Sequence, residues 1–310
     1  MGGKRNFSAC SGCSLCLLSC PVWRSTHDIR LTPHGRAKAM QHGASAIDLV
    51  ESIDSCTLCG ACEPACPEDI DLMTMVTGLR GELPSRTEIL FDGVSPAPTD
   101  QVNTPSILLI NAELANQPGL VTTIIHLFGG DIAISLAADS GTDISLSLCE
   151  GAKIADERLS AFLAPLKTTL RVIVADGHLQ FALKSWLPGV TVVSLGEALS
   201  TLPSVRGNLR DSDLYVIEAV AFHRDHARLI SHYDNLRLTT GCTMNLDLQR
   251  MAIPATFGAR HSGKANADDQ IHWILEGHQP SRIVVEDAAD IAAFQRIFNT
   301  PVIHLATLVD

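Results

Sequence analysis

Apolar positions recur with a helical period in the first part of the chain. After a Cys-Pro pair, they stand at Leu72, Val76, Leu79 and Leu83. This spacing predicts a helix. Thr32 and Pro33 supply an N-cap and a first-turn proline, and 36–41 contains no helix breaker, so another helix is predicted there. We therefore expect the N-terminal region to be mostly α-helical.

Downstream, short aliphatic and β-branched runs alternate with helical stretches. These runs are 107–110, 171–174, 191–195, 214–217, 283–285 and 302–305. Such alternation predicts α/β layers with largely parallel strands. The segment 120–138 is apolar, but His126 and a Gly-Gly-Asp break interrupt it, so it predicts helix, turn and strand. We expect no membrane span.

The downstream region also repeats itself. Residues 171–176 reappear as 282–287, and 106–112 resemble 213–219. Upstream of the repeats, three prolines among polar residues are typical of a linker. The predicted organisation is an α+β multidomain chain with a helical domain over 1–91, a linker over 92–105, and two α/β lobes over 106–205 and 206–310.

Composition and charge narrow the class of protein. Of 310 residues, 46% are hydrophobic and 18% charged, which excludes a disordered chain. The net charge of −11 would repel a phosphate backbone, so we expect no nucleic-acid partner. The polar start at 1–7 resembles no secretory signal, and we expect a cytoplasmic chain that a partner could attach to a membrane.

Eight of the ten cysteines fall in two runs that share one spacing. The runs are Cys10, Cys13, Cys16 and Cys20 before Pro21, and Cys56, Cys59, Cys62 and Cys66 before Pro67. Disulfides are a poor explanation without an export signal, because cytosolic thiols stay reduced. The spacing is that of bacterial two-cluster ferredoxins, in which three thiolates hold one iron–sulfur cluster and the fourth serves the other.

This spacing predicts two [4Fe–4S] clusters with crossed ligation. The first would be held by Cys10, Cys13, Cys16 and Cys66, and the second by Cys56, Cys59, Cys62 and Cys20. Zinc is the alternative metal. It prefers two Cys-x-x-Cys pairs around one tetrahedral ion and has no use for four cysteines in each run.

The N-terminal region resembles the helical-ferredoxin iron–sulfur subunits of heterodisulfide reductase C, glycolate oxidase and anaerobic glycerol-3-phosphate dehydrogenase. Residues 32–36 (Thr-Pro-His-Gly-Arg) resemble that group's Ser-Pro-Arg-Gly-Arg segment, and 56–67 resemble its second cysteine run. The resemblance covers 1–91. It implies electron transfer within an oxidoreductase complex that contains a flavoprotein partner and other redox subunits.

The lobes are similar to the tandem CCG modules of the same subunits, with most of the cysteines replaced. Residues 149–151 and His261-Ser262-Gly263 lie where Cys-Cys-Gly runs would be, and 221–226 resemble a Tyr-His-Asp-Pro-Cys strand end. Asp176 and Glu286-Asp287 stand where the last cysteines would begin. We therefore expect no catalytic residue in this chain.

Residues outside the runs leave further ligand sites open. His223, His226 and His261 could form a replacement metal site with His232 and Cys242, although spacing does not show that they converge. Cys149 and Cys242 could form a redox pair, but a lone cysteine usually packs as a small hydrophobe. Arg36 is expected to form a structural ion pair, although a cation beside a cluster would raise its potential.

Three functions remain in view. The first is an electron-transfer subunit that relays electrons between a flavoprotein and another redox partner. The second is an enzyme with a cryptic heterodisulfide-reducing or hydroxy-acid-oxidising site in the lobes. The third is a cluster-based redox sensor, for which the sequence offers neither a helix-turn-helix nor a basic patch. The first function accounts for the eight cysteines with the fewest assumptions.

Overall fold

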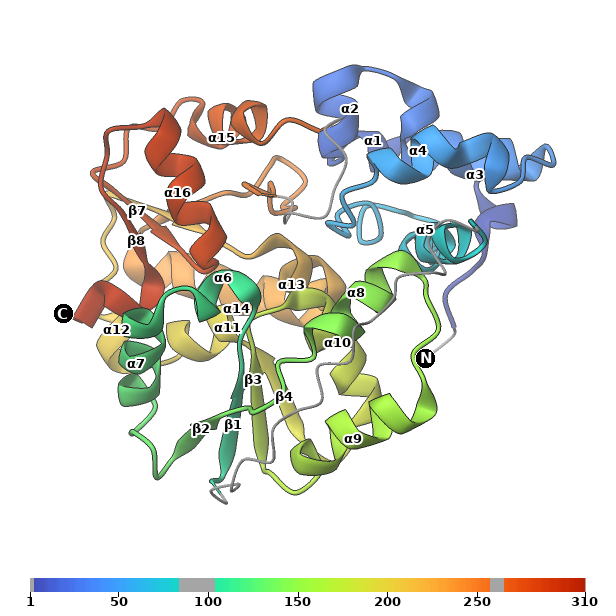
Figure 1. Cartoon of the computed structure of the whole chain (residues 1–310). Coiled ribbons are helices and arrows are strands. Elements are labelled where there is room, and N and C mark those ends of the chain that lie inside the picture. The colour runs from blue at the N-terminus through green and yellow to red at the C-terminus, as the bar shows by residue number, and fades with distance from the viewer. Residues whose placement is uncertain (1–2, 84–103, 257–264, 310) are drawn as a thin grey trace.

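The computed structural model describes residues 3–83, 104–256 and 265–309. Figure 1 shows a helical N-terminal part that lies against two α/β units. The expected linker falls mostly outside these ranges, as do His261, Ser262 and Gly263. The helical and α/β composition follows the predicted pattern.

Short helices form the N-terminal part. They are η1 (Phe7–Ala9), α1 (Leu15–Leu18), α2 (Pro21–Thr26), η2 (Ile29–Leu31), α3 (Pro33–Gln41), η3 (Ile47–Leu49), α4 (Val50–Ser55) and α5 (Leu72–Gly81). The helix predicted from Thr32 and Pro33 is α3, and the Thr32 hydroxyl accepts a hydrogen bond from the Gly35 amide as its N-cap. The helix predicted after the second Cys-Pro pair is α5, which ends at Gly81.

The first α/β unit is a four-stranded parallel sheet in the order β2-β1-β3-β4. Its strands are β1 (Ser106–Leu109), β2 (Ile134–Leu136), β3 (Arg171–Val174) and β4 (Thr191–Ser194). Its helices are α6 (Ala112–Ala115), α7 (Pro118–Leu127), α8 (Thr142–Glu150), α9 (Asp156–Leu166), α10 (Gly177–Trp186), α11 (Leu195–Ser200) and α12 (Pro203–Arg206). In register, Ser106 of the central β1 pairs with Ile134 and Arg171.

The second unit repeats this strand order as β6-β5-β7-β8. Its strands are β5 (Asp213–Val216), β6 (Thr243–Met244), β7 (Arg282–Val285) and β8 (Val302–His304). Its helices are α13 (Ala219–Arg224), α14 (His226–Thr240), α15 (Ala267–Leu275), α16 (Ala288–Ile297) and the terminal η5 (Leu305–Val309). Every predicted strand is present, and 120–138 contains α7 and β2 as expected, whereas β6 was not predicted.

The two sheets share one hydrophobic core. Ile173 of β3 and Val284 of β7 belong to the same buried cluster, together with Tyr215 of β5. The C-terminal η5 of the second unit packs on α7, α11 and α12 of the first. Because apolar surface buried between the units stabilises their association, the two sheets form one body.

The helical part meets the first unit through a contact between two glycine backbones. A Cβ on Gly81 of α5 would lie 2.5 Å from the Gly151 carbonyl oxygen, and one on Gly151 would lie 1.9 Å from the Thr77 carbonyl oxygen. Gly151 also has a φ of +66° at the end of α8, which disfavours other residues. Both positions therefore require glycine.

No helix in the described ranges is long and apolar enough to cross a membrane.

Replacing Gly81 with alanine should destabilise the fold, although alanine favours helix. Gly78, in the same helix, is the matched control, because a Cβ there would meet no atom within 4 Å. We expect Gly78→Ala to raise the free energy of unfolding by about 0.5–1 kcal/mol. Gly81→Ala should lower it, because its methyl group meets a backbone oxygen. Urea unfolding of both variants checks this, and equal gains would contradict the close contact.

Candidate iron–sulfur site and adjoining pocket

The first cysteine run forms a tight loop before α1. Gly12 has a φ of +86° and Ser14 a φ of 65°, so left-handed residues flank Cys13 on both sides. The second run curls in the same way around Cys59, between Leu58 (φ 55°) and Gly60 (φ +78°). Left-handed conformations at non-glycine residues are costly and concentrate at functional sites.

Each loop gathers the last cysteine of the other run. Cys10, Cys13, Cys16 and Cys66 line one small pocket. Burial raises the pKa of Cys16 to about 12, and the neighbouring Cys66, Cys10 and Cys13 contribute to this rise. The structure thus brings these four thiols together, as the crossed arrangement requires; their ligation of a cluster stays a prediction.

The second set is assembled around Cys20, which is the N-cap residue of α2. Burial raises the pKa of Cys20 to about 11 and that of Cys59 to about 12, with Cys56 contributing to both rises. Burial also raises the pKa of Cys62, again with a contribution from Cys56. These four thiols are therefore neighbours, and all of them would lose protons when they bind a metal group.

Buried guanidinium groups surround the second set. Nε of Arg24, Arg36 and Arg80 has no hydrogen-bond partner in the described structure. Orphaned buried N–H groups are rare in folded proteins. These unpaired N–H groups, near four thiols, could donate hydrogen bonds to an anionic group that contains sulfur, whereas a bare cation would repel them. Among the described residues, no three His, Cys, Asp or Glu side chains form a single-ion site.

The histidines considered as a replacement metal site have other roles here. His223 Nε2 accepts a hydrogen bond from the Ala252 amide at 3.0 Å, so its Nδ1 donates to the Cys59 carbonyl oxygen at 2.7 Å. His232 Nε2 lies 2.9 Å from the Ser200 hydroxyl. His226 packs edge-on against Phe222, and His261 lies outside the described residues. The described members do not converge.

The two remaining cysteines lie apart from one another. Cys149 packs in a cluster with Leu58 and Val76, beside the second run. Cys242 is buried in the core shared by the sheets, where its sulfur accepts a hydrogen bond from the Thr240 hydroxyl. No disulfide joins any of the ten cysteines.

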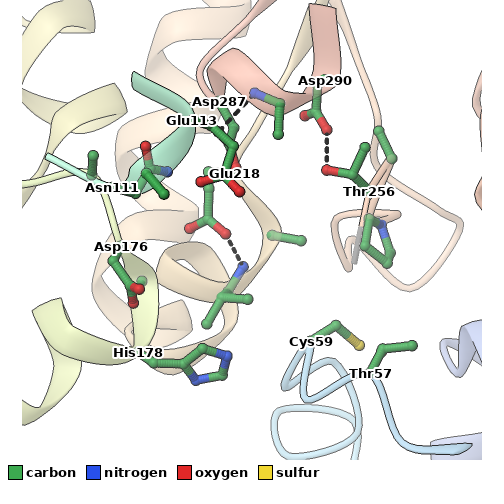
Figure 2. A pocket seen from close by; sticks show the side chains of 18 of the residues that line it. Thr57, Cys59, Asn111, Glu113, Asp176, His178, Glu218, Thr256, Asp287 and Asp290 are labelled. Carbon is green, nitrogen blue, oxygen red and sulfur yellow. Dashed lines mark hydrogen bonds between the residues drawn. The ribbon is translucent and has the colours of Figure 1, made fainter. Parts of the chain in front are cut away.

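A pocket of about 340 Å³ lies between the two sheets and the second cysteine loop. Figure 2 shows acidic and amide side chains on one side of it, with Thr57 and Cys59 on the other. Two residues after the ends of β1, β3, β5 and β7 stand Asn111, Asp176, Glu218 and Asp287, and each caps the next helix. The carboxyl ends of parallel strands are where ligands bind in α/β folds.

The pocket is acidic. Among the described residues that line it, Glu113, Asp176, Glu218, Asp287 and Asp290 are acidic, and no lysine or arginine is present. Burial raises the pKa of Glu218 and Asp290 to about 8 each, and that of Asp287 to about 6. Some of these carboxyl groups are therefore protonated near neutral pH.

This pocket was not predicted from the sequence. The sequence marks Asp176 and Asp287 only as positions where CCG modules would have cysteines. It does not mark Glu113, Glu218 or Asp290 as site residues. Glu286 accepts hydrogen bonds from the hydroxyls of Tyr215 and Tyr233 and does not line the pocket. The signal that could have revealed the pocket was an acidic or amide residue after each central strand of both sheets.

Comparison with known families agrees with the cysteine geometry. Residues 6–70 match the family described as a 4Fe-4S dicluster domain. No curated protein and no solved structure matched the chain. The N-terminal part is thus an iron–sulfur, ferredoxin-type domain, and the family match ends before the two sheets.

Replacing Asp290 with asparagine should change how stability depends on pH. Burial raises the pKa of Asp290 from 3.8 to about 8 in the folded state. The protonated Asp290 therefore stabilises the fold fully at pH values below 3.8, and this stabilisation is lost as the pH rises to about 8. The free energy of unfolding of the native chain should fall between pH 6 and pH 9. In Asp290→Asn, we expect this fall to be smaller by at least about 1 kcal/mol. Urea unfolding measures this. The exposed Asp131→Asn is the control, and equal slopes in all three proteins would contradict the expectation.

Proposed function

We propose that this chain relays single electrons through two [4Fe–4S] clusters. Cys10, Cys13, Cys16 and Cys66 would hold the first cluster, and Cys56, Cys59, Cys62 and Cys20 the second. The observation that carries the proposal is the exchange of the last cysteine between the two loops, which brings each set of four thiols together. The match to a 4Fe-4S dicluster domain supports iron–sulfur electron transfer.

Each cluster would accept and release one electron at a time. The protein residues hold the thiols in place and exclude water from the second set. Cys59 is 8% exposed and Cys20 7% exposed, whereas Cys13 is exposed. The first set therefore contains the most exposed thiol, and in this proposal it receives the electron from an external donor, whereas the second set lies nearer to the lobes.

The finer proposal is that the chain serves an oxidoreductase complex of the heterodisulfide reductase C and glycolate oxidase type. A flavoprotein subunit would supply electrons, and another redox subunit would accept them. The two lobes would be degenerate CCG modules from a duplication, which the identical strand orders support. A cytoplasmic location is part of the same proposal.

Crossed ligation can be tested with matched cysteine variants. The native chain should bind about eight iron atoms, because each cluster contains four. Cys20→Ser should damage the cluster on Cys56, Cys59 and Cys62, and Cys66→Ser should damage the other one. Iron analysis with electron paramagnetic resonance (EPR) of the reduced proteins distinguishes the two clusters. If Cys20→Ser instead lost the cluster on Cys10, Cys13 and Cys16, or Cys66→Ser lost the cluster on Cys56, Cys59 and Cys62, ligation would not be crossed.

A second candidate function is catalysis in the acidic pocket, and the presence of Cys59 in its lining favours this candidate. A substrate there would lie beside the second cysteine set. Those carboxyl groups of the pocket that are ionised would repel hydroxy acids and other anions, and no described lysine or arginine lines the pocket to attract them, so a neutral or cationic molecule such as an amine fits this pocket better. This restricts the substrate class that an enzyme of this structure would take.

The relay and the enzyme can be separated by one set of assays. We expect the isolated chain to show no turnover of hydroxy acids, amines or disulfides with an artificial acceptor. In the assembled complex, Cys149→Ser combined with Cys242→Ser should keep near-normal electron flow, because neither thiol belongs to a run. Turnover by the isolated chain that Glu218→Gln abolishes would establish the pocket as a catalytic site and overturn the simple relay.

A further inference from the structure

Three buried arginines lie around the second cysteine set. Arg36 and Arg80 are each 1% exposed, and the side chain of Arg24 is 7% exposed. They come from α3, α5 and α2, so the sequence separates them widely. Buried arginines are rare unless their charge is compensated.

Each guanidinium group approaches a different part of the second set. Arg80 Nη2 donates to the Cys56 carbonyl oxygen at 2.8 Å. Arg36 Nη1 donates to the Leu31 carbonyl oxygen at 3.0 Å, and Leu31 packs with Cys20 in one buried cluster. The Arg36 charge opposes the rise that burial causes in the pKa of Cys20. The Arg24 charge interacts with both Cys59 and Cys20.

Two of the arginines have carboxylate partners, and Arg36 has none among the described residues. Arg24 pairs with Asp247 at 3.0 Å, and Arg80 lies 3.5 Å from Glu150. Arg36 Nη1 donates only to neutral oxygens, those of Leu31 at 3.0 Å and of Ser52 at 2.7 and 3.2 Å. The Arg36 charge is therefore uncompensated within the described structure.

The uncompensated charge of Arg36 calls for an anion at this place. A buried cation without a counter-charge strongly destabilises a fold, and neutral carbonyl groups compensate it only in part. Arg36 Nε also has no hydrogen-bond partner in the described structure. The four thiols of the second set become negatively charged when they hold a cluster, which would supply both the missing charge and an acceptor.

The first set has a different environment. A cation beside it is Lys38, whose Nζ donates to the Cys10 carbonyl oxygen at 3.1 Å and to Gln41 at 2.8 Å. Burial and the neighbouring cysteines are the main causes that raise the pKa of Cys16. Lys38 is half-buried, so solvent screens its charge more than it screens that of Arg36.

We infer that Arg36 is the counter-ion of the second cluster and, together with Arg24 and Arg80, raises its reduction potential above that of the first. Reduction adds one negative charge to a cluster, and nearby buried cations stabilise that charge. One electron would leave the first cluster, oxidising it, and reduce the second, with no atom transferred. The electron would then lie beside the acidic pocket, which Cys59 of the second set lines. This inference rests on the proposed presence of two clusters.

Arg36→Gln tests this inference by removing the charge and retaining a polar side chain. EPR-monitored redox titration of the chain with both clusters gives the two potentials separately. We expect the equilibrium constant for electron transfer from the first cluster to the second to fall at least about tenfold, which corresponds to about 59 mV. The shift should persist at high salt, because the charge is buried.

Two variants serve as controls for Arg36→Gln. Arg30→Gln removes an arginine of the same domain whose side chain is 79% exposed, and it should leave both potentials unchanged. Arg36→Lys keeps the charge and should retain most of the native difference between the potentials. If Arg36→Gln does not assemble, Arg24→Gln provides the same measurement with a smaller expected fall, because Asp247 already offsets part of the Arg24 charge.

The outcomes distinguish this inference from the proposed function. A native chain with only one cluster would overturn the two-cluster relay itself. If Arg36→Gln contains both clusters and their potentials are unchanged, the inference is wrong and the relay stands. The same holds for Arg24→Gln if Arg36→Gln does not assemble. A native first cluster with the higher potential would also overturn it.

Discussion

The rest of the structure depends on one buried guanidinium group, that of Arg80. It donates to the Cys56 carbonyl oxygen at 2.8 Å and to the Cys149 carbonyl oxygen at 2.9 Å. One side chain therefore joins the second cysteine loop to the end of α8. Hydrogen bonds that involve a charged donor are stronger than neutral ones, and the exclusion of water strengthens them further. The position of the loop over the pocket follows from this contact.

Further contacts hold the loop against the second α/β unit. His223 donates to the Cys59 carbonyl oxygen, and Glu63 pairs with Arg224 at 3.2 Å. On the other side of the set, Arg24 pairs with Asp247 and lies 4.8 Å from the ring centre of Trp273. The second cysteine set is thus enclosed by the domain that carries it and by both α/β units, whereas the described residues around the first set all belong to its own domain.

Local patterns in the sequence were sufficient to predict most strands and the helices α3, α5 and α7, but not the pocket. The cysteine spacing, the N-cap at Thr32 and the aliphatic runs are local, and each specifies one element. Strand β6 has only two residues, which is too short for a recognisable pattern. The pocket and the arginine environment join residues that are distant in sequence. Arg36 was expected to form an ion pair, and only the structure shows that no described carboxylate meets it.

The backbone contact between Gly81 and Gly151 also limits thermal motion at the junction. Side chains at an interface can change rotamers and let two domains slide, but two glycine backbones in direct contact have no rotamers to change. The gap between the second cysteine loop and the sheets should therefore vary little with time. For any electron exchanged between the second cluster and a molecule bound in the pocket, the distance of transfer would then be nearly constant.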